Sequence, residues 1–145
     1  LLKSLGITDL KKVQRIYEHL LELFCEFPPK LLIDKTILEE LKTKVKDISI
    51  ISNTGFVHSK LIDNWMMDIG IDEYFESGIF SDRLGYFKPN PLIYVHLMEN
   101  FNLQFPNEIL HVGNDDSTDG ELCRRTGMQY FKVMGNNYTD ILKHV

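Results

Sequence analysis

Apolar side chains recur every three or four positions in several segments of the chain, the spacing that gathers them on one face of a helix. The clearest case spans residues 7–27, where the pattern ends at a pair of prolines. The same spacing predicts helices over residues 36–46, 56–70 and 91–101, a short helix that ends at Thr126-Gly127, and a frayed one near the C-terminal end.

Capping signals support the first two of these helices. Thr8 or Asp9 is the candidate N-cap of the first helix, because their side-chain oxygens can accept from free backbone N–H groups. Thr36, followed three positions later by Glu39, is the candidate cap of the second.

Four short apolar runs alternate with the helices and predict buried strands. They span residues 47–51, 78–80, 109–112 and 129–134. Strands that alternate with helices favour a parallel sheet with right-handed crossovers, so the sequence indicates the α/β class.

Size and charge narrow the range of functions. A chain of 145 residues is long enough for one domain with a real core. Its net charge of -5, with no dense Lys/Arg cluster, argues against nucleic acid as a partner, and no apolar run reaches the roughly 20 residues needed to span a membrane. Cys25 and Cys123 lack ligand-like spacing, so we expect reduced thiols and a cytoplasmic location, while the oligomeric state stays open.

Acidic side chains follow the third predicted strand directly. Asp115, Asp116 and Asp119 lie between that strand and the next helix, at the strand end where open α/β sheets bind ligands. Carboxylates there suit Mg²⁺, which takes one or two protein carboxylates together with water and phosphate. The competing interpretation is a solvated loop that caps the helix.

Two further segments carry candidate chemistry. The first strand ends in Ser52-Asn53 and a glycine-containing turn, whose hydroxyl and N–H donors could hold a phosphate, although a plain polar turn would look the same. Lys88 precedes a proline and a helix, where its cation could neutralise a carboxylate or a phosphoryl group; an ordinary surface lysine is the alternative.

These three segments, in this order, resemble the haloacid dehalogenase-like hydrolase superfamily. The resemblance is carried by ISIISNTG (48–55), SDRLGYFKPNPLIY (81–94) and HVGNDDSTDGELCRRTGM (111–128). It implies a Rossmann-like parallel sheet flanked by helices over residues 31–145, and it makes residues 1–30 the C-terminal part of a helical cap.

The resemblance also implies roles for single residues. Ser52 is similar to the family's hydroxyl that binds the transferring phosphoryl group, with Asn53 beside it. Lys88 is similar to the lysine that steadies the charge of nucleophile and phosphate. Asp115 resembles the Mg²⁺ ligand, and Asp119 resembles the second acid, which either assists the metal or orients Lys88.

The function that follows from the resemblance is a Mg²⁺-dependent phosphatase of small phosphorylated metabolites, working through an aspartyl-phosphate intermediate. A one-residue shift would put Asn114 in the place of Asp115. The main alternative is a catalytically inactive binding or regulatory member. A dehalogenase does not need the acidic cluster, and a receiver-like signalling domain would carry its acids near the N-terminus.

One motif of the family has no counterpart here, because the sequence lacks the Asp-x-Asp nucleophile motif of the first strand. Asp34-Lys35-Thr36 is a look-alike, but one helix and one strand fill the short interval between Asp34 and Ser52. We therefore expect the nucleophile strand upstream of Leu1 and no turnover by this chain alone. We also expect no direct pairing between the strands that end at Ser52 and Gly113.

Overall fold

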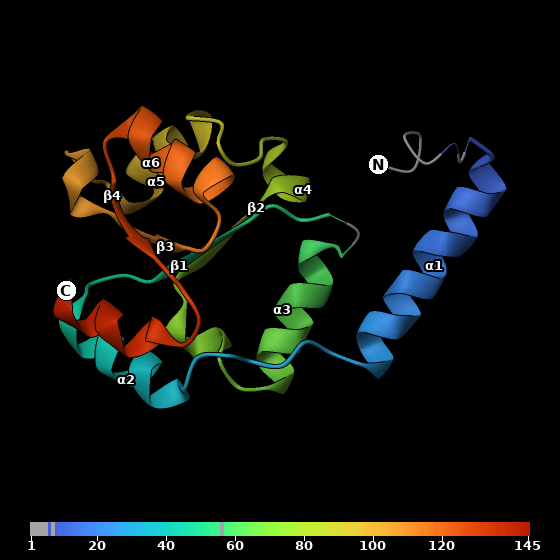
Figure 1. Ribbon diagram of the computed structural model, residues 1–145, viewed down its shortest axis with the longest axis horizontal. Coiled ribbons are helices and arrows are strands. Elements are labelled where there is room, and N and C mark those ends of the chain that lie inside the picture. The colour runs from blue at the N-terminus through green and yellow to red at the C-terminus, as the bar shows by residue number, and fades with distance from the viewer. Residues whose placement is uncertain (1–5, 7, 56) are drawn as a thin grey trace.

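The computed structural model describes residues 6, 8–55 and 57–145 (Figure 1). The expected starts of two helices, at Ile7 and Phe56, and the first residues of the expected cap segment lie outside the described residues.

Helices and strands alternate along the chain much as expected. The helices are α1 (Leu10–Glu26), α2 (Lys35–Lys44), α3 (Ser59–Asp68), α4 (Ser81–Leu84), α5 (Leu92–Phe101) and α6 (Glu121–Thr126). The strands are β1 (Ser49–Ser52), β2 (Ser77–Phe80), β3 (Leu110–Gly113) and β4 (Gln129–Lys132). Helical segments of other than α type are η1 (Asp72–Tyr74), η2 (Pro106–Glu108), η3 (Asp116–Gly120) and η4 (Asn137–Lys143).

Local signals account for most boundaries and for two differences. Asp9 caps α1 by accepting from the Lys11 N–H, as predicted. Asp34, rather than Thr36, caps α2, because the Asp34 carboxylate accepts from the Thr36 backbone N–H. The four-residue helix α4 was not predicted, since one turn is too short to show a helical period.

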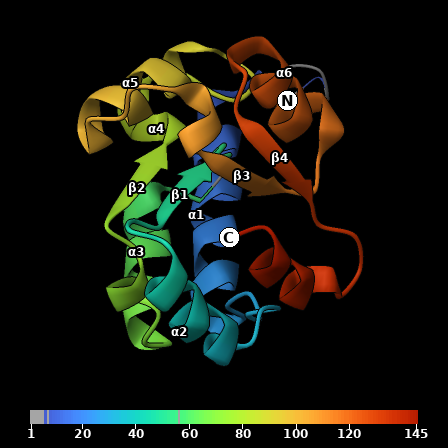
Figure 2. The same ribbon diagram turned by 90° about the vertical axis from the view of Figure 1, so that its left-hand side faces the viewer.

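The strands form two parallel pairs. β1 pairs with β2, with Ser52 opposite Phe80, and β3 pairs with β4, with Gly113 opposite Lys132. The parallel arrangement confirms the predicted α/β class. Among the described residues β1 and β3 belong to separate sheets, although they are the inner strands of the two pairs in Figure 2.

Helices cover the strands on both sides (Figure 2), and buried apolar side chains form a core on each side. One core joins α2, α3 and the C-terminal segment to the strands through buried apolar side chains: Ile37, Leu38, Leu41, Met66, Ile71, Phe131 and Ile141. The other joins α5 and α6 to the opposite face: Ile79, Ile93, Leu97, Leu122, Cys123 and Met128. Successive strand residues point to opposite faces, which is why Phe131 packs in the first core and Tyr130 against the second.

Helix α1 stands apart from this body (Figure 1). It has no buried residue, and Leu10 on its predicted apolar face is 81% exposed. Its Tyr17 ring meets the His58 ring edge-on, with 5.5 Å between ring centroids. In the part of the chain that the structure describes, every helix is too short or too polar to cross a bilayer.

Candidate active site

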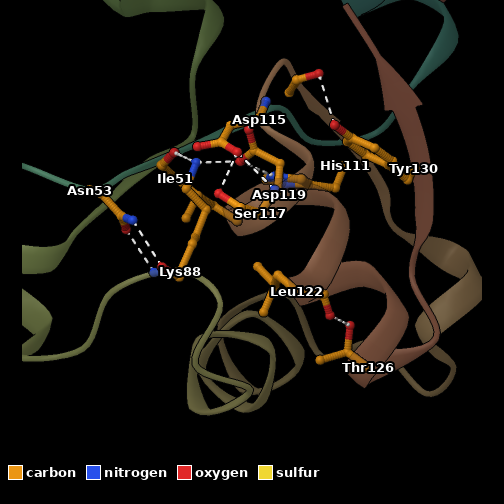
Figure 3. A network of polar contacts seen from close by, with 11 residues as sticks. Ile51, Asn53, Lys88, His111, Asp115, Ser117, Asp119, Leu122, Thr126 and Tyr130 are labelled. Atoms are coloured by element: carbon orange, nitrogen blue, oxygen red, sulfur yellow. Dashed lines mark hydrogen bonds and ion pairs between the residues drawn. The ribbon is translucent and has the colours of Figure 1, made fainter.

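Lys88 lies where the C-terminal end of β1 meets the loop after β3. Its ammonium Nζ donates to the Asp119 carboxylate at 2.6 Å and to the Ile51 carbonyl at 3.1 Å. The Lys88 and Asp119 side chains are both largely buried, so water screens their ion pair only weakly. Two sequence segments far apart in the chain therefore meet in one charged contact (Figure 3).

Asn53 fixes the backbone of Lys88 from the end of β1. The Asn53 side-chain oxygen accepts from the Lys88 N–H at 2.7 Å, and its amide group donates to the Lys88 carbonyl at 3.0 Å. Lys88 is thus held at both its backbone and its ammonium group. Ser52, the third predicted residue here, is half-buried and lies between Ile51 and Asn53, which both contact Lys88.

Asp119 is 3% exposed and is surrounded by donors. Its Oδ1 accepts from Lys88 and from the His111 ring nitrogen Nε2, 2.9 Å away, and its Oδ2 accepts from the Asp115 N–H at 3.1 Å. Gly113 makes room for this carboxylate, because a Cβ at that position would lie 2.3 Å from the Asp119 Cγ atom. The glycine that ends β3 is therefore a steric requirement of the site.

The charge of Asp119 follows from these contacts. Burial raises the pKa of Asp119, but hydrogen bonds from His111 and Lys88, with the Lys88 charge, outweigh it and hold the pKa well below its usual range. Asp119 is therefore an ionised acceptor paired with a cation at neutral pH.

Asp115 has a different environment, at the exposed start of η3. Its Oδ1 accepts from the Ser117 N–H at 2.8 Å and from the Ser117 hydroxyl at 2.6 Å. These hydrogen bonds lower the pKa of Asp115. The acidic loop thus supplies a cap to η3 through Asp115, which stays exposed to solvent, whereas α6 has no side-chain cap.

The carboxylates of this site can be compared with the ligands that Mg²⁺ prefers. Within residues 6, 8–55 and 57–145 the structure has no cluster of three or more His, Cys, Asp or Glu side chains arranged to hold a metal ion. Both Asp119 oxygens already accept hydrogen bonds and are buried. The Asp115 carboxylate is exposed, and its oxygens are hard ligands of the kind that Mg²⁺ prefers. The arrangement fits one carboxylate ligand, Asp115, with water or phosphate filling the remaining positions.

Sequence reasoning missed two residues around this site. His111 was assigned to a buried apolar run, although a histidine two positions before Gly113 shares its strand face and points to Asp119. Asp82, in α4, accepts from the Ser59 backbone N–H and hydroxyl, and from the Thr54 hydroxyl at 3.0 Å. These contacts join the loop after β1 to the segment that leads to Lys88. The sequence did not predict this role of Asp82, because α4 is too short to be recognised and Asp82 belongs to no motif.

A family model described as haloacid dehalogenase-like hydrolase matches residues 4–133 of the chain. In sequence, the chain is 26% identical over 137 residues to the human haloacid dehalogenase-like hydrolase domain-containing protein 3, covering 93% of this chain and 53% of that protein. It is 28% identical over 90 residues to a glyceraldehyde 3-phosphate phosphatase of Methanopyrus kandleri, covering 60% of this chain and 38% of that protein. The chain thus spans about half or less of these curated relatives.

In structure, the chain is similar to a candidate beta-phosphoglucomutase from Thermotoga maritima. The TM-score is 0.72 at 19% identity, over 99% of this chain and 74% of that one. At this identity the similarity shows a shared fold.

Proposed function

Because the chain belongs to the haloacid dehalogenase-like hydrolase family, we propose that it forms most of the core of a Mg²⁺-dependent phosphatase of small phosphorylated molecules. The observation that carries the proposal is the buried Lys88–Asp119 pair at the end of β1, the strand whose last residue is the hydroxyl-bearing Ser52. A fixed cation at this strand end suits a transferring phosphoryl group, whose charge it can offset. The phosphatase name of the Methanopyrus relative supports the same choice of reaction.

Each residue has a separate part in this proposal. The Ser52 hydroxyl donates to a phosphoryl oxygen, and the Lys88 ammonium offsets the charge of that group and of the nucleophile. Asn53 holds the Lys88 backbone. Asp119 orients Lys88 rather than binding the metal, because both Asp119 carboxylate oxygens already accept hydrogen bonds.

Asp115 is the residue that would hold Mg²⁺, through its exposed carboxylate. When bound, the ion supplies positive charge to the phosphate oxygens and to the attacking carboxylate. The phosphoryl group is transferred first to an aspartate and then to water, which releases inorganic phosphate.

We further propose that the nucleophile lies on a strand outside residues 1–145 that inserts between β1 and β3. The two inner edges are incompletely covered: every residue of β1 is only half-buried, and Val112 of β3 is 40% exposed. A strand there would pair with backbone groups of both neighbours, as buried sheets require. Residues 1–30, including α1, would then belong to a helical cap over the site.

Asp34 does not suit the nucleophile role. Its carboxylate accepts from the Thr36 N–H at 3.0 Å and from the Thr36 hydroxyl at 2.9 Å, and it caps α2 from an exposed position. The network around Lys88 instead uses residues from the end of β1 and the loop after β3.

The second candidate function is a catalytically inactive binding or regulatory protein that uses the same residues to bind phosphate. The observation that favours it is the absence of an Asp-x-Asp motif from the sequence.

The net charge of -5 supports small molecules over nucleic acid as partners. The free thiols of Cys25 and Cys123 support a cytoplasmic location.

The test uses a form of the protein that includes the segment proposed to carry the nucleophile. We expect it to hydrolyse p-nitrophenyl phosphate with Mg²⁺ and not with EDTA, and Asp115→Ala to abolish turnover because it removes the metal carboxylate. The matched control is Asp116→Ala, since Asp116 is the neighbouring exposed acid and pairs with Lys132 instead. We expect this control to stay within about threefold of the parent, because a surface ion pair contributes little.

Undiminished turnover in Asp115→Ala would remove the metal assignment. Binding of orthophosphate without any turnover by the longer protein would favour the regulatory function instead.

A further inference from the structure

His111 lies on the same face of β3 as Gly113, two positions away. Gly113 leaves the space that the Asp119 carboxylate fills, and His111 places its Nε2 atom 2.9 Å from Oδ1 of that carboxylate. The same face of β3 therefore provides both the space at Gly113 and the hydrogen-bond donor at His111 that the Asp119 carboxylate uses.

The imidazole ring has a fixed orientation. It is 7% exposed and stacks on the Tyr130 ring of the paired strand, with 6.4 Å between centroids and 22° between planes. Tyr130 lies directly opposite His111 in the β3–β4 register, and its hydroxyl donates to the Gly113 carbonyl at 3.4 Å. The direction of Nε2 is thus set by two paired strands rather than by a mobile loop.

The protonation of Nε2 follows from its partner. An ionised carboxylate can only accept, so the His111 nitrogen that faces Asp119 must carry a hydrogen and donate it. Lys88 and His111 then share Oδ1, and Figure 3 shows them reaching the carboxylate from opposite sides. The Asp115 N–H holds the other oxygen, so the plane of the carboxylate is fully determined.

We propose that His111 is a positioning residue for phosphoryl transfer, which holds the Asp119 carboxylate so that it directs the Lys88 ammonium to the C-terminal end of β1. This inference rests on the proposed phosphatase function. Without the His111 donor, the Asp119 carboxylate can rotate about its side-chain bonds. The Lys88 ammonium then moves with the carboxylate, because it is 2.6 Å from Asp119 Oδ1 and 3.1 Å from its other partner, the Ile51 carbonyl. The group that offsets phosphoryl charge would then be displaced while the substrate could still bind.

Two substitutions separate the donor from the packing. His111→Gln keeps an N–H donor at a comparable reach, whereas His111→Met fills a similar volume without one. His19→Met is the matched control, because His19 lies on the exposed α1 helix and its side chain is 69% exposed. The free energy of unfolding of each variant shows whether a change in turnover is only a loss of folding.

The first readout is metal-free NMR of the ¹⁵N-labelled protein, and it does not depend on turnover. We expect the parent to show a proton on His111 Nε2 and a slowly exchanging Lys88 ammonium signal. His111→Gln and the control should keep the Lys88 signal, and His111→Met should lose it. A parent protein with Nε2 unprotonated, or an unchanged Lys88 signal in a folded His111→Met, would overturn the proposal.

The second readout is steady-state kinetics with p-nitrophenyl phosphate and Mg²⁺. We expect His111→Met to lower kcat about 10- to 100-fold, an effect of the size typical for removing outer-shell partners at metal sites, with KM nearly unchanged. His111→Gln should recover most of kcat. Equal kcat in the folded Met and Gln variants would contradict a positioning role. If the parent protein itself has no turnover, the phosphatase function fails and a role in phosphoryl transfer fails with it, whereas the Lys88 signal still decides whether His111 positions Asp119 and Lys88.

Discussion

At the scale of single residues, the electrostatics of the site depend on Asp119. It accepts from Lys88, His111 and the Asp115 N–H while it is almost fully buried. Such a carboxylate stabilises the fold only as long as its cation is present, because an unpaired charge of either sign is costly in the interior. Gly113 is tied to the same acid, since any side chain there would occupy the space of the carboxylate.

We predict that Asp119→Asn destabilises the protein by about 3 kcal/mol at neutral pH, because it leaves the Lys88 charge unpaired. Since the folded-state pKa of Asp119 is below its unfolded value, the charged carboxylate favours the native state above about pH 4, and this contribution is lost as the pH falls further. The variant should therefore show a flatter fall of stability below about pH 4. Urea unfolding from pH 3 to pH 7 measures both effects.

The control for this experiment is Asp68→Asn, on the exposed side of α3, which should follow the parent curve. A double variant, Lys88→Met with Asp119→Asn, should recover much of the lost stability, since it removes the Lys88 charge that the single variant leaves unpaired. An unchanged pH profile in Asp119→Asn would show that the pair does not stabilise the fold.

At the scale of elements, the sequence predicted the order and type of the main helices and strands because their apolar periods are long enough to count. It did not predict α4, which has a single turn, or the cap at Asp34, because Thr36, two positions later, fits the same role. The convergence of Lys88, Asp115 and Asp119 came from the resemblance to a family, since no spacing along the chain reveals that Lys88 joins the end of β1 to the loop after β3. The sequence did not identify His111 as a site residue, because a buried structural residue and a buried functional residue fit the same strand pattern.

The cap of α2 gives a prediction about the nucleophile. Asp34→Ser keeps a side-chain oxygen for the Thr36 N–H but removes the carboxylate, so the variant should fold and retain full turnover in the longer protein. Asp34→Ala removes the cap and should lower the unfolding midpoint relative to Asp34→Ser without lowering kcat. Loss of turnover in a folded Asp34→Ser would instead identify Asp34 as the nucleophile and contradict the proposed upstream strand.

At the scale of the whole molecule, two parallel pairs of strands share helical layers but not hydrogen bonds, within the described residues. The Lys88 ammonium reaches the Ile51 carbonyl at the end of β1, close to the edge where we propose an additional strand. Helix α1, whose apolar side chains are mostly half-buried, extends beside this body. A completed sheet would bring a nucleophile, a cation and a metal carboxylate to one end of the molecule.

The most direct test of this account is a crystal structure of the longer protein with Mg²⁺ and orthovanadate, a phosphate mimic. We predict that the vanadate oxygens lie within hydrogen-bond distance of the Ser52 hydroxyl and the Lys88 ammonium, with Mg²⁺ on the Asp115 carboxylate and Asp119 still paired with Lys88. Vanadate bound away from the C-terminal ends of β1 and β3, or Mg²⁺ held by residues other than Asp115, would contradict it.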